Sequence, residues 1–249
     1  LKPDDVVTLK LTYICDIPKD KFTKFGYDDS DEMYLKNWFL TPARFENNDF
    51  VRYSNLNLDD IANAQFDILL KLKLPKNNKS VSDLSSNGII EEDVHSVYTY
   101  SGKNRNDFNL FIGPKLNFNS YKNSIVDVVC NLKESRLNSI QKAVVIDRIV
   151  HYVNDNIGQY PFDKITVSQV DYERNPFYGL NQLPSFISPF PDEFMFEIKF
   201  LKTYLNNFLQ DCFVLTRFHS QLCYFGRIQL VSQFDFNVVR IGNNSGSIS

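Results

Sequence analysis

The chain has 249 residues, of which 43% are hydrophobic and 14% aromatic, so it carries enough apolar material to bury a core in one or two domains. Its 27 basic and 30 acidic residues give a net charge of −3, and no basic block or stripe occurs, so nucleic acid is not an expected partner. No window approaches about 18 consecutive apolar residues, so no membrane-spanning helix is expected in this region.

Alternating apolar and polar residues predict a series of short strands in the first half of the chain. Residues 6–17 predict a strand with one solvent-facing side, and residues 66–74 predict another that ends at a turn rich in Pro and Asn. Further strands are predicted at 94–100, 109–112 and 124–132. The apolar stretch 34–43, which holds the only Trp, has no clear period and is expected to be packed irregular chain. Together these segments predict an antiparallel sheet or sandwich.

The second half of the chain shows helical spacing instead. Apolar residues three and four apart predict an amphipathic helix over 135–157. A strand is predicted at 165–170, and four prolines predict irregular structure over 172–191. A second helix is predicted to begin at Asp192, where acidic residues match the positive end of a helix dipole. Its buried stripe is predicted to comprise Phe194, Ile198, Leu201, Leu205 and Phe208.

Cysteines and histidines are too scattered to indicate a metal or redox site. The cysteines never form C-x-x-C and are expected to be buried free thiols. Of the three histidines, His151 is expected to interact locally with Asp147, four residues earlier on the predicted helix. The four cysteines are Cys15, Cys130, Cys212 and Cys223.

Residues 216–249 have weaker periodicity and end in a Gly, Asn and Ser-rich stretch typical of a frayed terminus.

Several segments, taken in order, resemble the aminopeptidase N family of zinc metallopeptidases, a gluzincin group that includes leukotriene A hydrolase. They are residues 13–18, Trp-Phe-Leu-Thr-Pro-Ala at 38–43, residues 53–60, Tyr-Pro-Phe-Asp-Lys-Ile-Thr-Val at 160–167, and Tyr-Gly-Leu-Asn-Gln-Leu-Pro at 178–184. The resemblance covers roughly residues 1–212. It implies a mixed α and β fold with two parts. An N-terminal antiparallel β saddle or sandwich domain (1–133) is followed by the α/β opening of a thermolysin-like domain (134–249), in which 216–249 no longer resembles the family.

The segment at 178–184 matches the family's G-A-M-E-N loop. In the family the glycine lets substrate backbone approach, and the glutamate binds the free α-amino group of the peptide. Gly179 matches the glycine, whereas the glutamate position falls on Asn181, an amide that brings no opposing charge. The resemblance therefore implies Gly179, Leu180, Asn181 and Gln182 as peptide-binding residues. A peptide or protein N-terminus is the expected partner, with weakened discrimination for a free amino group.

The family's zinc helix carries H-E-x-x-H, in which two histidines share one helix face and the glutamate activates the metal-bound water. The matching segment here is Phe196-Glu197-Ile198-Lys199-Phe200. Phe has no lone pair, so this helix cannot hold zinc, and Glu197 keeps the general-base position without a metal water to activate. The family's third ligand falls on His219, which cannot build a site alone. No cofactor is expected in this chain, although the family it resembles uses zinc.

The same five residues also have a purely structural interpretation. Phe196 and Phe200 then pack in a core, and Glu197 is a solvated acid on a helix surface. The sharper hypothesis is a metallopeptidase-like protein that no longer hydrolyses peptides but retains a peptide-binding cleft.

Two alternatives stay open. One is a fragment of an active zinc-dependent aminopeptidase with its ligands elsewhere, since the chain begins at Leu1 rather than Met and the family's catalytic domain is longer, so a truncated piece is expected. The other is a β-sandwich adhesion or scaffold module, which predicts no cleft between the two halves.

Overall fold

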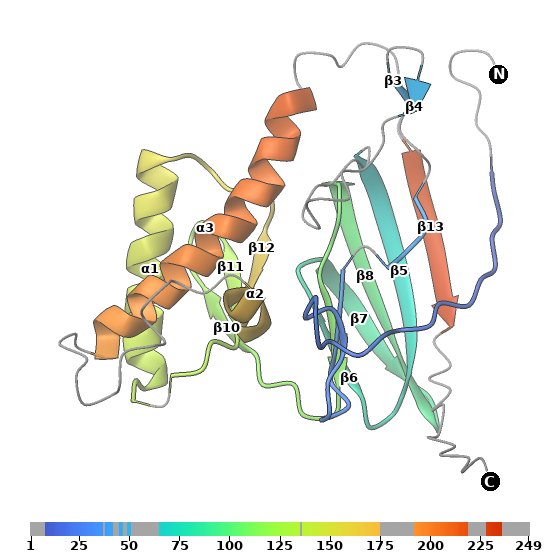
Figure 1. Cartoon of the computed structure of the whole chain (residues 1–249), viewed down its shortest axis with the longest axis horizontal. Helices are drawn as coiled ribbons and strands as arrows, with labels where there is room; N and C mark the ends of the chain where they lie inside the picture. The colour runs from blue at the N-terminus through green and yellow to red at the C-terminus, as the bar shows by residue number, and fades with distance from the viewer. Residues whose placement is uncertain are drawn as a thin grey trace, which may run out of the picture.

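The computed structural model describes residues 8–36, 38–41, 45–46, 49–50, 65–134, 136–174, 192–218 and 228–235. Its strands are β1 (Gly26–Tyr27), β2 (Met33–Leu35), β3 (Phe45–Glu46), β4 (Asp49–Phe50), β5 (Phe66–Pro75), β6 (Lys79–Ser82), β7 (Ser85–Glu91), β8 (His95–Arg105), β9 (Leu110–Gly113), β10 (Asn119–Lys122), β11 (Asp127–Cys130), β12 (Lys164–Val167) and β13 (Ile228–Asp235). Its helices are α1 (Ser139–Asn156), α2 (Gln169–Arg174) and α3 (Asp192–Phe218). The three helices lie with β10–β12 on one side of the molecule, and the longer strands lie on the other (Figure 1).

The strand-rich side, here called the β half, packs two four-stranded sheets face to face. One sheet has the order β1-β2-β9-β6 and the other β13-β5-β8-β7, while β3 and β4 pair separately. All pairs are antiparallel except β13 with β5. A single hydrophobic cluster includes Leu70 and Leu72 of β5 together with Leu110 and Ile112 of β9, so both sheets contribute to one sandwich core.

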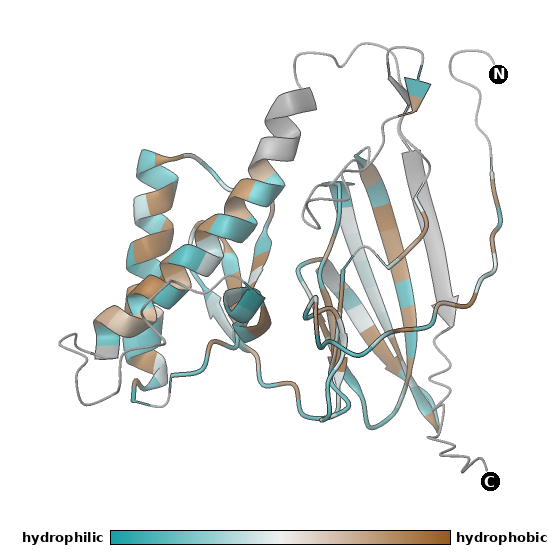
Figure 2. Cartoon of the chain, in the orientation of Figure 1, coloured by the Kyte–Doolittle hydropathy of each residue, from teal (hydrophilic) through white to brown (hydrophobic). Residues whose placement is uncertain are grey.

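The alternation in sequence explains β5, the central strand of this core. Every second side chain from Phe66 to Leu74 is buried, and those between are more exposed. Figure 2 shows hydrophobic and hydrophilic bands along β5. The strands predicted at 66–74, 94–100 and 109–112 are confirmed as β5, β8 and β9.

The other side, here called the α/β half, is built on the three-stranded sheet β10-β11-β12. β11 and β12 are parallel, and α1 connects them, as parallel neighbours require a crossover. The predicted helix over 135–157 is confirmed as α1, which starts later because Asn138 caps it. Asn138 Oδ1 accepts the backbone N–H of Gln141 at 2.9 Å, and Gln141 Oε1 accepts that of Asn138 at 3.0 Å.

Other predicted boundaries also differ from the structure. The strand expected over 165–170 ends at Val167, because the Ser168 hydroxyl accepts the N–H of Asp171 at 3.0 Å and caps α2. Irregular structure was expected from 172, but α2 continues to Arg174. The strand expected over 124–132 is shorter, as β11.

The strand predicted at 6–17 is wrong for the described residues 8–17, which form no strand. Leu9 and Leu11 are 74% and 64% exposed, and none of the strands that the structure describes pairs with this segment. Cys15 in this segment is exposed, which contradicts the expectation of buried thiols there. Cys130 is buried, and burial raises its pKa to about 12. Cys212 is partly buried, and Cys223 lies outside the described residues.

The last strand joins the β half. Residues 228–235 form β13, which pairs in parallel with β5 over its whole length, although the periodicity of residues 216–249 was too weak to predict a strand here. A segment of the predicted second part of the chain (134–249) therefore completes a sheet built from the predicted first part (1–133). The division near residue 133 stays a prediction. None of the helices described is long and apolar enough to cross a membrane.

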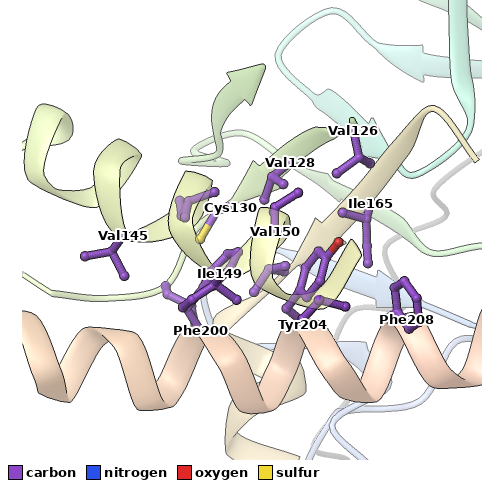
Figure 3. Packing of buried hydrophobic residues seen from close by; sticks show 14 of the residues in the cluster. Val126, Val128, Cys130, Val145, Ile149, Val150, Ile165, Phe200, Tyr204 and Phe208 are labelled. Carbon is purple, nitrogen blue, oxygen red and sulfur yellow. The ribbon is translucent and has the colours of Figure 1, made fainter. Parts of the chain in front are cut away.

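The buried stripe of α3 differs from the predicted one. Phe194 is exposed, and the fully buried positions are Phe196, Phe200 and Tyr204, followed by Phe208. Both stripes obey helical spacing, so periodicity alone did not decide which face of α3 meets the sheet. Figure 3 shows the α3 rings against Val145, Ile149 and Val150 of α1 and Val128, Cys130 and Ile165 of the sheet.

Buried polar side chains join the two halves. The Tyr34 hydroxyl lies 2.7 Å from Asp171 Oδ1 and 3.0 Å from Asn109 Oδ1, and Asn109 Nδ2 donates to Thr166 Oγ1 at 3.2 Å. Burial, followed by the Asp171 carboxylate, raises the pKa of Tyr34 well above its usual value, so its hydroxyl stays a donor. Nearby, Lys164 Nζ donates to the carbonyl of Leu84 at 3.2 Å. The halves are therefore held by specific hydrogen bonds.

Asn109→Ala is expected to lower the free energy of unfolding by about 1–3 kcal/mol, because it leaves Thr166 without its buried donor and Tyr34 without one acceptor. Urea denaturation measures the change. The control is Asn87→Ala on β7, whose side chain bonds Ser101 at the surface and should cost no more than about 0.5 kcal/mol. Equal effects of the two substitutions would show that the buried network does not stabilise the fold.

Candidate functional site

The helix segment that aligns with H-E-x-x-H lies in the core of the α/β half. Phe196 and Phe200 are both 0% exposed, and their ring centroids lie 6.1 Å apart. The stack continues to Tyr204, 5.6 Å from Phe200, and then to Phe208 at 6.1 Å from Tyr204. Residues four apart share a helix face, so α3 presents one aromatic column to α1 and the sheet. The positions that carry histidines in the resembled family are packing positions here.

Glu197 lies at the side of this column, where α3 meets α1. Its side chain is 29% exposed, and Arg148 Nη2 of α1 lies 2.7 Å from its carboxylate. Arg148 also approaches Glu193 at 3.9 Å. The structure thus places the general-base position in an ion pair between two helices, the environment of a partly solvated structural acid.

Zinc does not fit this helix, because the donors are absent. Neither phenyl ring offers a lone pair, and both are enclosed by apolar neighbours. Within the part of the chain that the structure describes, no three His, Cys, Asp or Glu side chains are grouped to hold a metal ion. His219 lies outside the described residues, as do Gly179, Leu180, Asn181 and Gln182. His151 contacts Asp147 at 3.6 Å, as expected from their spacing.

The structure also gathers a buried charged cluster that the sequence did not indicate. Asp83 and Arg105 of the β half lie 3.8 Å apart, and Arg105 Nη2 donates to the carbonyl of Asp83 at 3.0 Å. The guanidinium lies over the ring of Phe162, 3.6 Å from its centroid. From the α/β half, Tyr160 donates a hydrogen bond to Asp211 of α3. These residues are far apart in sequence, so no local spacing signals the cluster.

Burial shapes the acidity of this cluster. Burial and then the nearby Asp83 carboxylate raise the pKa of Asp211 to about 6, against the opposing effects of Tyr160 and Arg105. Burial also raises the pKa of Asp83, which Arg105 partly offsets. Arg105 pairs directly with Asp83 and acts on Asp211 only through its charge, so Asp211 gains a proton as the pH falls through about 6.

The space between the halves beside this cluster is small. A cavity of about 20 Å³ has room for about one water molecule. It is lined by Lys36, Asp83, Asp107, Phe108, Asn109, Asn207, Gln210 and Asp211. At the edge of β12, the carbonyl of Thr166 already accepts a hydrogen bond from Asn207 Nδ2 at 2.8 Å. An extended peptide therefore has no room between the halves at this point.

Phe200→Ala is expected to lower the free energy of unfolding by about 3–5 kcal/mol, because it opens a cavity in the aromatic column. Glu197→Gln should cost less than about 1 kcal/mol, since its ion pair is partly solvated. Chemical denaturation of both variants measures the difference. A costly Glu197→Gln beside a mild Phe200→Ala would contradict the packing role assigned to this helix.

Asp211 predicts a pH dependence of stability. Its pKa rises from 3.8 to about 6 on folding. The stabilisation that this carboxyl gives the fold is therefore fully present below about pH 4 and is lost as pH rises through 6. Asp211→Asn does not titrate and keeps an acceptor for Tyr160. The free energy of unfolding of this variant, relative to that of the unaltered chain, should therefore increase from pH 4 to pH 7.5 by on the order of 3 kcal/mol.

Unfolding free energies measured across this pH range test the expectation. The control is Asn206→Ala, an exposed substitution on the same helix that removes no titrating group, and its stability should change with pH in parallel with that of the unaltered chain. A parallel curve for Asp211→Asn as well would mean that Asp211 is not desolvated in the fold.

Comparisons with known proteins give a partial structural likeness. No protein-family model matches the sequence, and no curated protein matches it. Among solved structures, an M1 zinc metallopeptidase from Deinococcus radiodurans aligns with 41% of this chain and 26% of its own at 14% identity and a TM-score of 0.29. A two-domain M1 zinc metallopeptidase mutant bound to L-arginine aligns with 62% of this chain and 36% of its own, at 12% identity and a TM-score of 0.35. The alignments thus span about a quarter to a third of those proteins, and a likeness at this level leaves the activity of this chain open.

Proposed function

We propose that this chain is a zinc-metallopeptidase-like protein that does not hydrolyse peptides through a zinc on α3 and instead binds an extended peptide. The observation that carries the loss of catalysis is the complete burial of Phe196 and Phe200, which stand in the register of both histidine ligands. The ion pair between Glu197 and Arg148 supports it, since the acid at the general-base position already has a structural partner. The family link rests on the ordered sequence segments described above.

The peptide-binding part of the proposal concerns residues 179–182. Gly179 keeps the residue type that allows close backbone approach, and Asn181 offers an amide where the resembled family has a carboxylate. Because Asn207 already bonds the edge carbonyl of β12 at Thr166, the peptide is proposed to contact the loop and not this carbonyl. An uncharged amide would tolerate a blocked N-terminus better than a carboxylate does.

A non-catalytic scaffold is the second candidate, and one observation favours it. The halves meet through buried hydrogen bonds around Asn109, and the cavity beside them holds about one water molecule. A module that holds two sheets and a helical layer in fixed relation needs no cleft. Peptide binding discriminates this candidate from the first, since a scaffold of this kind binds no peptide N-terminus.

Metal content and peptide hydrolysis test the first part of the proposal. Protein purified without chelator should contain far less than one zinc per chain by mass spectrometry, and should not hydrolyse aminoacyl-amide substrates with zinc added. Stoichiometric zinc with turnover would contradict the proposal and favour an active aminopeptidase with ligands elsewhere.

Asn181→Asp tests the peptide site. A carboxylate at this position should strengthen binding of free N-terminal peptides over acetylated ones by about tenfold, because it brings a charge opposite to the ammonium. Fluorescence anisotropy with labelled peptide pairs measures the ratio. Asn154→Asp, on the exposed end of α1, is the control and should leave the ratio unchanged. Absence of peptide binding in the unaltered chain and both variants would leave the scaffold as the better account.

A further inference from the structure

A second cavity, of about 480 Å³, lies at the surface of the α/β half. Lys142 of its lining also contacts the aromatic column, with its Nζ 5.7 Å from the centroid of the Phe196 ring. It is formed where the start of β10, the segment that follows β11 and the first turn of α1 meet. Its size falls within the range of small-molecule sites. It is lined by Asn117, Asn119, Asn131, Leu132, Lys133, Glu134, Arg136 and Lys142.

The charges around this cavity are unbalanced. Glu134 is the only acid of the lining. Its buried carboxylate accepts two hydrogen bonds from the Arg136 guanidinium, at 3.0 and 3.3 Å, and one from the Arg136 backbone N–H at 3.2 Å. Burial opposes ionisation, but these hydrogen bonds lower the pKa of Glu134, so the acid and the guanidinium neutralise each other. None of the ion pairs found among the described residues involves Lys133 or Lys142. Two ammonium groups therefore line the cavity in excess.

Two charged residues outside the lining, one acidic and one basic, do not remove this excess of positive charge. Glu32 of the β half feels the charge of Lys133, but it does not line the cavity, and burial raises its pKa. Lys199 of α3 lies close enough to Glu134 to lower the pKa of that acid, which adds a further positive charge to the surroundings. The electrostatic environment of the cavity is positive.

Backbone and amide groups add to the positive character. α1 begins at Ser139 beside the cavity, and no acidic residue in its first turn offsets the positive end of the helix dipole. Asn131 Oδ1 accepts the N–H of Gln169 at 2.7 Å, which leaves its amide nitrogen as a donor. The chain at Lys133 is fixed by a hydrogen bond from its N–H to Gln169 Oε1 at 2.9 Å. Cations, amide donors and a helix start thus converge on one cavity of fixed backbone.

We propose that this cavity binds a small polyanion that carries two or more carboxylate or phosphate groups. Two anionic groups match the two lysines that lack acidic partners, and the asparagine amides supply neutral donors to the remaining oxygens. The site is separate from residues 179–182, and it stands whether or not the chain binds peptides.

Calorimetric titration with citrate and with pyrophosphate, at constant ionic strength in NaCl, tests the proposal on the whole chain. At least one of the two should bind saturably. Lys133→Gln combined with Lys142→Gln should weaken that binding at least about tenfold, since both ammonium groups are removed. The control, Lys71→Gln with Lys103→Gln, removes the same charge from exposed positions of β5 and β8 and should leave binding unchanged.

The outcomes separate the sources of the anion. Binding of citrate alone assigns the site to carboxylates, binding of pyrophosphate alone assigns it to phosphates, and binding of both shows that charge is recognised in either form. No binding of either anion beyond NaCl would overturn the proposal. Equal weakening in both double variants would also overturn it, because it would show attraction by net charge alone. Circular dichroism of both variants verifies that the fold is intact.

Discussion

The aromatic column of α3 is the contact on which the α/β half depends. Phe196, Phe200, Tyr204 and Phe208 fill the space between α1 and the three-stranded sheet, and large buried rings contribute most of the packing area of a small core. A metal site at the same helix turn would need imidazoles and an open coordination position in that space. Packing and metal binding are therefore exclusive uses of this face, and the chain uses it for packing.

The junction of the two halves has a different chemistry from either core. Apolar clusters lie on both sides, while Asn109, Asp83, Arg105, Asp171 and Asp211 meet between them. Buried hydrogen bonds add less net stability than apolar contact, but each misplaced partner costs a full desolvation penalty. Such a junction fixes one relative orientation of the halves more strongly than it stabilises them.

Local sequence patterns predicted an element correctly where its apolar face packs against a neighbouring element. The alternation of β5 and the spacing of α1 were sufficient, because each buries its predicted face. The same alternation failed at 8–17, since a strand needs a neighbour that local sequence does not encode. For α3, two stripes satisfied one helical period, and only the position of the sheet chose between them. The Asp83–Arg105–Asp211 cluster has no local signature at all, and the expected residues 179–182 and His219 lie outside the described residues.

The parallel pairing of β13 with β5 has a consequence for the order in which the chain acquires structure. β5 forms from residues near 70, but its outer edge is covered only when residues 228–235 arrive, after the whole α/β half has been synthesised. Until then β5 presents an open row of backbone donors and acceptors next to a hydrophobic face, a template for association with other chains. Completion of the sheet β13-β5-β8-β7 is thus a late, long-range event. Such events slow folding and extend the time for which the edge of β5 stays unprotected.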